Sequence, residues 1–217
     1  MSVGAMRRAQ PSRRPEPLLG WRLWRARDGA LESWAASWTW GPGHNHARCL
    51  APGRRCLRPP GRGCLCGYWG LFSPLGTLER ARAERTEQAS VLGLIRGWGE
   101  AAVHGNEGFR AEYAGVACLF SDWVWDAPEM PCPEQGLGRA WWLAKRRFGY
   151  LPRPVPPDPA RQRQLEATAS LYEVPLLRLE DAVELHVLEE MGATQAMVDE
   201  VRAWLDMAGP GRLWKAD

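Results

Sequence analysis

The chain has 217 residues, of which 45% are hydrophobic and 24% are charged, a composition typical of a globular protein. This length allows one domain of ordinary size with an appendage and excludes several large domains. The longest apolar stretches have about eight residues, as in 113–120, whereas a membrane-spanning helix needs about 20. No apolar segment follows the N-terminal arginines, so we expect neither a transmembrane segment nor a secretory signal, and a cytoplasmic protein.

The charges are distributed unevenly along the chain. Residues 1–66 contain 12 arginines and three acidic residues, whereas residues 161–217 carry a net charge of −5. A basic front permits an anionic partner, and nucleic acid is the partner that we consider first. Two solvated faces, or two ends that face each other, are the alternative.

The pattern along the chain predicts an α+β protein. Residues 1–17 read as a disordered basic tail, and residues 18–122 as a β-rich domain with Gly-rich turns. Predicted strands are Trp21–Arg25, Leu31–Trp34, 67–72, 91–103 and 109–120. Short strands interrupted by glycines favour a small, strongly curved β-sheet or a partly open barrel.

Helices are predicted mainly in the C-terminal part. Ser73-Pro74 is typical of an N-cap followed by a first-turn proline and predicts a helix to about Gln88. Residues 123–159 read as a Pro-rich linker with a short helix over 141–148, and residues 160–217 as a helical segment. Helices are expected there to about Tyr172, from Asp181 to Met191, and from about Thr194 to Ala208. The last has an apolar face that needs a partner, formed by Val198, Val201, Trp204, Leu205 and Ala208.

The strongest chemical signal lies in the loop 44–66, which carries Cys49, Cys56, Cys64 and Cys66 after His44 and His46. Zinc takes four tetrahedral ligands, usually thiolates or imidazoles, and a structural zinc would fold a loop with few apolar residues. A shell with His44 or His46 in place of Cys56, free thiols, an iron–sulfur cluster, a redox disulfide, and a catalytic zinc with three cysteines and water are the alternatives.

Basic and aromatic residues flank these cysteines. Arginines can contact phosphates, and exposed tryptophans can stack on bases. The candidate nucleic-acid-binding residues are Arg54, Arg55, Arg58, Arg62, Trp38, Trp40 and Trp69. Core packing is the more common use of tryptophan and is the alternative for these rings.

A second cluster lies in the hairpin around His104, Glu107, Arg110, Glu112 and Tyr113. A histidine near carboxylates can act as a general acid or base, which would make the protein a hydrolase or nuclease. We favour a hairpin without catalysis, because no nucleophile or known catalytic signature accompanies it. Phosphate-loop, dinucleotide and zinc-protease fingerprints do not occur in the sequence.

Three stretches together resemble a family of bacterial proteins, common in actinobacteria, that has no established activity. They are Cys64-Leu65-Cys66-Gly67-Tyr68-Trp69, Val91-Leu92-Gly93 through Trp98-Gly99, and Gly108-Phe109-Arg110-Ala111-Glu112-Tyr113-Ala114. The resemblance covers about residues 20–120 and implies no catalytic residue. In that family a histidine often stands between the first cysteine and the Cys-x-Cys pair, which implies that Cys56 replaces a ligand here.

The sequence therefore predicts a non-enzymatic binding module with a structural zinc, which binds nucleic acid through its arginine-rich front. A protein–protein adaptor that uses the Val198/Val201/Trp204 face, and a hydrolase or nuclease built on His104 and Glu107, are the competing hypotheses.

Overall fold

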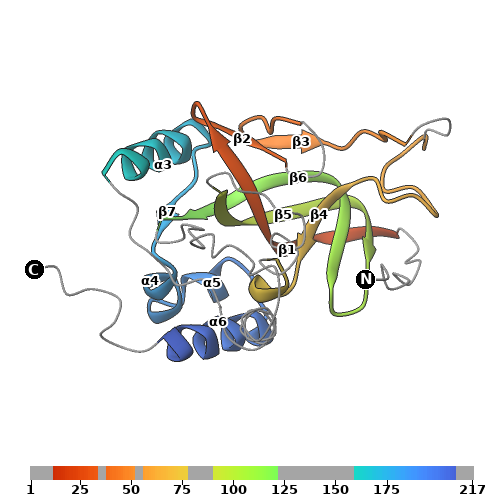
Figure 1. Ribbon diagram of the computed structural model, residues 1–217. Helices are drawn as coiled ribbons and strands as arrows, with labels where there is room; N and C mark the ends of the chain where they lie inside the picture. Colours follow the sequence, from red (N-terminus) through yellow and green to blue (C-terminus); the bar gives the residue numbers. More distant parts are fainter. Residues whose placement is uncertain (1–11, 34–37, 52–55, 78–89, 122–158, 209–217) are drawn as a thin grey trace, which may run out of the picture.

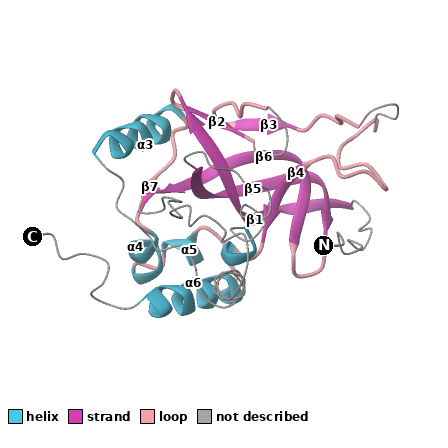
Figure 2. Cartoon of the chain, in the orientation of Figure 1, coloured by secondary structure: helices cyan, strands magenta, loops and turns pink. Residues whose placement is uncertain are grey.

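The structure is a computed structural model that describes residues 12–33, 38–51, 56–77, 90–121 and 159–208. Strands dominate the first half, and the described helices lie mainly in the C-terminal part (Figure 2). The strands are β1 (Ser12–Arg27), β2 (Ala30–Glu32), β3 (His44–His46), β4 (Tyr68–Leu71), β5 (Ser90–Val103), β6 (Gly108–Phe120) and β7 (Leu176–Leu177). The helices are α3 (Pro159–Leu171), α4 (Leu179–Glu184), α5 (Val187–Glu190) and α6 (Gln195–Ala208).

Seven strands form one strongly curved sheet, which confirms the predicted fold class (Figure 1). The long strand β5 pairs antiparallel with both β1 and β6. Strand β4 pairs with β6 and makes one further pair with β1, Trp21 opposite Leu71. These pairings close a ring of hydrogen bonds through β1, β5, β6 and β4, with β3 at the edge beyond β6.

The inside of this ring is built around Phe109, which is fully buried. Three glycines from three strands surround its ring, and a Cβ atom on any of them would lie within 2.3–2.7 Å of it: Gly20 on β1, Gly70 on β4 and Gly97 on β5. That distance is shorter than van der Waals contact, so only glycine lets the strands approach the aromatic ring this closely. The glycines that interrupt the predicted strands therefore serve packing.

Strand alternation divides the apolar residues between two clusters. The inner cluster contains Phe109, Ile95 and Trp24, and helix α3 joins it through Leu165 and Ala169. The outer cluster contains Trp21, Leu92 and Leu94, and the helices α4 to α6 pack on it (Figure 1). No helix among the described residues is both long and apolar enough to cross a membrane.

Several predicted elements need correction. Strand β1 begins at Ser12, inside the predicted tail 1–17, because residues 12–14 pair with β5. The predicted helix 181–191 is two short helices, since His186 has a left-handed backbone with φ of 57° between α4 and α5. Helices α3 and α6 confirm their predictions.

The helix predicted after Ser73 begins as expected, with residues 74–77 helical and Ser73 Oγ accepting a hydrogen bond from Gly76 N at 2.8 Å. Its continuation to Gln88 lies outside the described residues, as do the predicted linker up to 158 and its helix over 141–148.

The apolar face of α6 is not free for a partner. Val198 and Val201 are fully buried and Trp204 is 1% exposed, because they pack on the outer cluster of the sheet. The adaptor hypothesis built on this face is therefore wrong: the partner that the face needs is the protein's own sheet.

Candidate metal centre

The cysteine loop, residues 47–67, connects β3 to β4, and both of these strands pair with β6. At its start, Ala47 N donates to the carbonyl of Glu112 at 2.7 Å. At its end, Tyr68 pairs with Ala111. Because one strand holds both ends of the loop, the first and last cysteines are brought close together.

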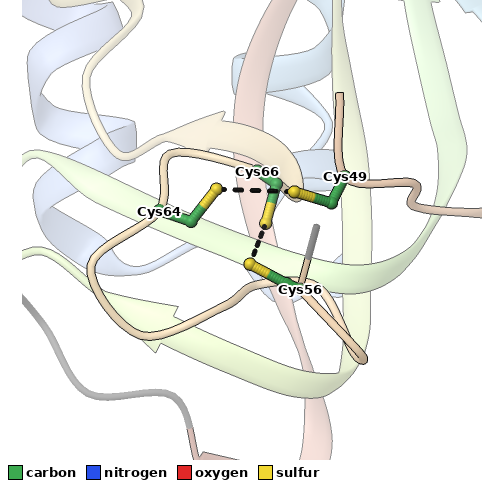
Figure 3. Close-up of side chains that lie close together, drawn as sticks. All are labelled: Cys49, Cys56, Cys64 and Cys66. Atoms are coloured by element: carbon green, nitrogen blue, oxygen red, sulfur yellow. Dashed lines mark hydrogen bonds between the residues drawn. The ribbon is translucent and has the colours of Figure 1, made fainter. Parts of the chain in front are cut away.

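The four predicted cysteines converge on one point (Figure 3). The Sγ atoms of Cys49 and Cys64 are 3.7 Å apart, those of Cys56 and Cys66 are 3.8 Å apart, and all four lie within 4.8 Å of one another. A disulfide has a sulfur–sulfur distance of about 2.05 Å, so none of these four cysteines forms a disulfide, and all are partly buried. Four convergent thiols form a set of ligands that can hold a metal ion.

Two glycines make this convergence possible. A Cβ atom at Gly61 would lie 2.0 Å from Cys56 Sγ, so a side chain there would take the place of the sulfur. Gly61 N also donates to Cys66 Sγ at 3.2 Å. Gly67 has a φ of 114°, a conformation that glycine adopts most readily, and it turns the chain from Cys66 into β4.

Arg110 on β6 ties the loop to the sheet. It is 2% exposed, and its Nη1 donates to the carbonyl of Cys64 and, at 3.2 Å, to that of Cys66. Its Nε donates to His104 Nε2 at 2.8 Å. Burial lowers the pKa of Arg110, whereas negative charge on Cys66, Cys64 and Cys56 raises it, so this cation offsets the charge of the sulfurs when they are ionised.

The surroundings affect the thiols differently. Hydrogen bonds from the backbone of Cys56 and Ala51 lower the pKa of Cys49 to about 6. Burial raises the pKa of Cys66 to about 12, and burial also raises that of Cys56. Without a metal, the cluster therefore holds protons, which an ion must displace when it binds the thiolates.

The described histidines and the remaining described cysteine lie apart from this centre. His46 is exposed and lies 3.8 Å from Glu112, and neither it nor His44 belongs to the group of convergent ligands. The mixed shell is therefore not the arrangement found. Cys118 is fully buried in the outer cluster, and Cys132 lies outside the described residues.

The predicted nucleic-acid-binding residues differ in how far they are exposed. Trp40 is 1% exposed, and its ring packs edge-on against Trp24 and Tyr68, so its prediction as an exposed stacking ring is wrong. Trp38 is half-buried, with Arg48 5.4 Å from its ring centre. Arg58 and Arg62 are exposed, and Arg54 and Arg55 lie outside the described residues.

Trp69 is half-buried, and one side of its ring is occupied. His104 stacks on it with centroids 4.9 Å apart, Arg110 lies 5.5 Å from its centre, and its Nε1 donates to the carbonyl of Leu65 at 3.0 Å. Trp69 therefore supports the metal loop from the side of the sheet.

These contacts also give His104 a structural role. The ring is 7% exposed, and Nε2 accepts the hydrogen bond from Arg110, while Glu107 is exposed at the turn. A buried imidazole whose Nε2 already accepts from a cation is poorly placed to take a proton from a substrate. His104 therefore contacts the same residues, Arg110 and Trp69, that support the metal loop.

Two features of the site were missed in the sequence. In the sequence, Arg110 was noted only in the hairpin cluster around His104 and in the resemblance, and nothing in the spacing links it to cysteines more than 40 positions away. The other feature is a Cys-Leu dipeptide that occurs three times. Leu50, Leu57 and Leu65 each follow a cysteine of the cluster and are 63%, 104% and 68% exposed. We refer to these three residues as the leucine collar.

Comparisons with protein-family models, with curated proteins and with solved structures found no match to this chain.

Proposed function

We propose that the protein is a non-enzymatic binding module, in which a structural zinc ion holds the cysteine loop and the basic surface beside it binds nucleic acid. The observation that carries the first part is the distance between sulfurs. A tetrahedron with zinc–sulfur bonds of about 2.3 Å has edges of about 3.8 Å. The pairs Cys49–Cys64 and Cys56–Cys66 lie at 3.7 and 3.8 Å.

A closed shell of four thiolates leaves no open position for a substrate or a water, which favours a structural role over a catalytic one. The composition of the loop supports the same conclusion. Its leucines point to solvent, and among its described residues between Cys49 and Cys66 only Pro59, Pro60 and Gly61 are buried. A loop with so little buried surface needs another source of stability, and zinc binding supplies about 10–16 kcal/mol in small peptides.

Charge supports the second part of the proposal. Arg58 and Arg62 are exposed on the loop, and the first 66 residues are strongly basic. Exposed guanidinium groups contact phosphates and displace the counterions that surround nucleic acid. A metal-held loop presents these groups at fixed positions.

The experiment combines elemental analysis of the purified protein with fluorescence anisotropy on labelled oligonucleotides at several salt concentrations. We expect about one zinc per chain, and an affinity that falls by orders of magnitude between about 50 and 200 mM salt. The double variant Arg58→Ala/Arg62→Ala should lower the slope of log K against log salt by about two.

A matched variant controls for charge alone. Arg163→Ala/Arg178→Ala removes the same charge from α3 and from the residue before α4, and should leave the slope unchanged. An affinity that does not depend on salt, or two double variants with equal effects, would contradict nucleic-acid binding by the loop.

The leucine collar favours a second candidate, a protein partner that docks on the metal loop. Each of these three leucines is exposed next to a cysteine of the cluster, and exposed apolar surface can mark an interaction site. In this case Leu57→Ser should abolish capture of a partner while Arg58→Ala/Arg62→Ala does not.

A further inference from the structure

The outer face of the sheet is covered over only part of its length. Helices α4 to α6 pack on the half that contains Trp21, Leu92 and Leu94. Further along β5 on the same face, Arg96 is exposed, and its Nη2 lies 3.4 Å from the carbonyl of Met191, just beyond the end of α5. Two positions beyond Arg96 on β5, Trp98 is half-buried.

Three aromatic side chains lie in one row across the sheet beyond Arg96. In the register of the sheet, His46 on β3 is opposite Tyr113 on β6, which is opposite Trp98 on β5. The rings of His46 and Tyr113 stack with centroids 4.8 Å apart and planes 22° apart. Those of Tyr113 and Trp98 stack at 6.1 Å and 16°. We call this row the ring ladder.

The ladder ends at the edge of the sheet, because β3 is the last strand in the order β2-β1-β4-β6-β3. The side chain of His46 is 58% exposed. An exposed ring at the end of a stack can be extended by another planar ring, and every nucleic-acid base has such a face.

The neighbouring row supplies positive charge. His44, Gly115 and Arg96 lie opposite one another, two positions along from the ladder on each strand. Gly115 has no side chain between the other two, and a Cβ atom there would lie 3.6 Å from the Trp98 ring and 2.9 Å from the carbonyl of Gly43. The two rows together contain three rings, one exposed arginine and no carboxylate.

Glu112 is the carboxylate that contacts the ladder, and it also accepts a backbone hydrogen bond. Glu112 is 13% exposed, lies 3.8 Å from His46 Nε2, and accepts a hydrogen bond from Glu100 N at 3.1 Å. Glu112 therefore lies beside the imidazole of His46, whereas Arg96 and His44 are the basic groups of the neighbouring row.

From this arrangement we propose that the ring ladder is a stacking platform for the bases of single-stranded nucleic acid, with Arg96 and His44 beside it for the phosphates. Bases are exposed for stacking only in single strands, so the platform selects single strands over duplex. This inference rests on the proposed function, and it moves base stacking from Trp38, Trp40 and Trp69 to His46, Tyr113 and Trp98.

The position of the platform also connects it to the metal centre. His46 stands three residues before Cys49, so the metal loop begins where the ladder ends. An ion bound to Cys49 fixes the chain that leaves β3 and keeps His46 in its row.

The test measures binding of the zinc-loaded full chain to three labelled probes: a thymidine strand of about 12 nucleotides, an abasic strand of the same length and charge, and the matching duplex. A uridine strand compares RNA with DNA. Base stacking is worth about 1–3 kcal/mol per base, so we expect the thymidine strand to bind about 5- to 150-fold more tightly than the abasic strand.

Variants then locate the stacking. Tyr113→Leu should remove most of the preference for the thymidine strand, and Tyr113→Phe, which keeps the ring, should retain it. Trp98→Leu and Trp98→Phe form a second pair, so that a folding defect in one leucine variant, detected by its zinc content, does not decide the outcome. Trp38→Leu should have no effect on the preference.

The outcomes separate the two proposals. If wild type binds thymidine and abasic strands equally, with salt-dependent affinity, the platform is overturned and the proposed function stands. A preference that survives both leucine variants, or that only Trp38→Leu abolishes, also overturns the platform. If wild type binds none of the probes at low salt, the proposed function is overturned and the platform with it.

Discussion

The ring of strands and the cysteine loop are both attached to β6, but different forces hold them. In the ring, strands approach closely around the buried Phe109, with glycines from β1, β4 and β5 making room for it. In the loop, the large apolar side chains of the leucine collar point to solvent. The ring is thus stabilised by apolar burial, whereas the described contacts of the loop are the convergence of four sulfurs and the hydrogen bonds of Arg110.

The difference shows how one strand can support two kinds of structure. Successive residues of β6 face opposite sides, so Phe109 fills the ring while Arg110 reaches the carbonyls of Cys64 and Cys66. A stable ring gives the loop a rigid base, and the loop itself need not contribute to the core. It can therefore carry exposed arginines and leucines.

Removal of a cysteine ligand should have the largest effect, because it should abolish metal binding by the loop and leave the ring of strands folded. Cys64→Ser leaves three thiolates for the ion, and we expect zinc content to fall from about one per chain to a small fraction, because structural zinc binding of about 10–16 kcal/mol depends on the full shell. The ring should keep its strand content. Elemental analysis and circular dichroism measure the two effects separately.

Cys118→Ala is the matched control, since Cys118 is buried in the outer cluster, away from the loop. It should retain the zinc. Equal zinc loss in both variants would show that the cluster at Cys49, Cys56, Cys64 and Cys66 is not the binding site.

Removal of the side chain at the centre of the ring of strands should destabilise the sheet and leave metal binding unchanged. Phe109→Ala leaves a cavity between four strands, and we expect a loss of about 3–5 kcal/mol in the free energy of unfolding. Denaturant titration followed by circular dichroism measures this loss. Zinc content of the folded protein should stay at about one per chain, whereas zinc loss under native conditions would mean that ring and loop form one cooperative unit.

The cysteine site could be predicted from the sequence because few residue types bind zinc, and four cysteines fall within a short stretch. Loops of this length can bend to bring their own cysteines together, so no knowledge of distant contacts was needed. The curved sheet was also predictable from the glycines that interrupt its strands, although β1 is longer than the predicted strand Trp21–Arg25. Phe109, however, meets Gly20 and Gly70 only through pairings between strands far apart in sequence, which local patterns do not encode.

The errors have a common physical origin. A tryptophan beside a basic loop can be buried or exposed, and Trp40 is buried because Leu31 and Tyr172 contribute hydrogen bonds around it: Tyr172 Oη donates to the Trp40 carbonyl at 2.6 Å and accepts from Leu31 N at 3.0 Å. Tyr172 is more than 130 residues away. The apolar face of α6 was recognised correctly, but its periodicity says only that it is covered, and not by what.

A smaller change inside the loop tests whether metal binding and the stability of the ring of strands are independent. Gly61 lies within the loop, and its missing side chain leaves room for Cys56 Sγ, which would lie 2.0 Å from a Cβ atom. Gly61→Ala adds one methyl group and removes no ligand. Because the added carbon and the sulfur cannot occupy the same space, we expect Cys56 to be displaced and zinc affinity to fall by about 10- to 100-fold.

Gly41→Ala provides the control, because the nearest atom to its Cβ would be Asn45 Oδ1 at an ordinary contact distance of 3.6 Å. Competition with a chromogenic chelator measures both affinities, and denaturant titration of both proteins reports on the ring. If the ring is independent of the loop, Gly61→Ala should weaken metal binding and leave the unfolding midpoint of the ring unchanged. A Gly61→Ala protein that competes for zinc as well as wild type would show that Cys56 is dispensable, and that the shell closes with three thiolates and a different fourth ligand.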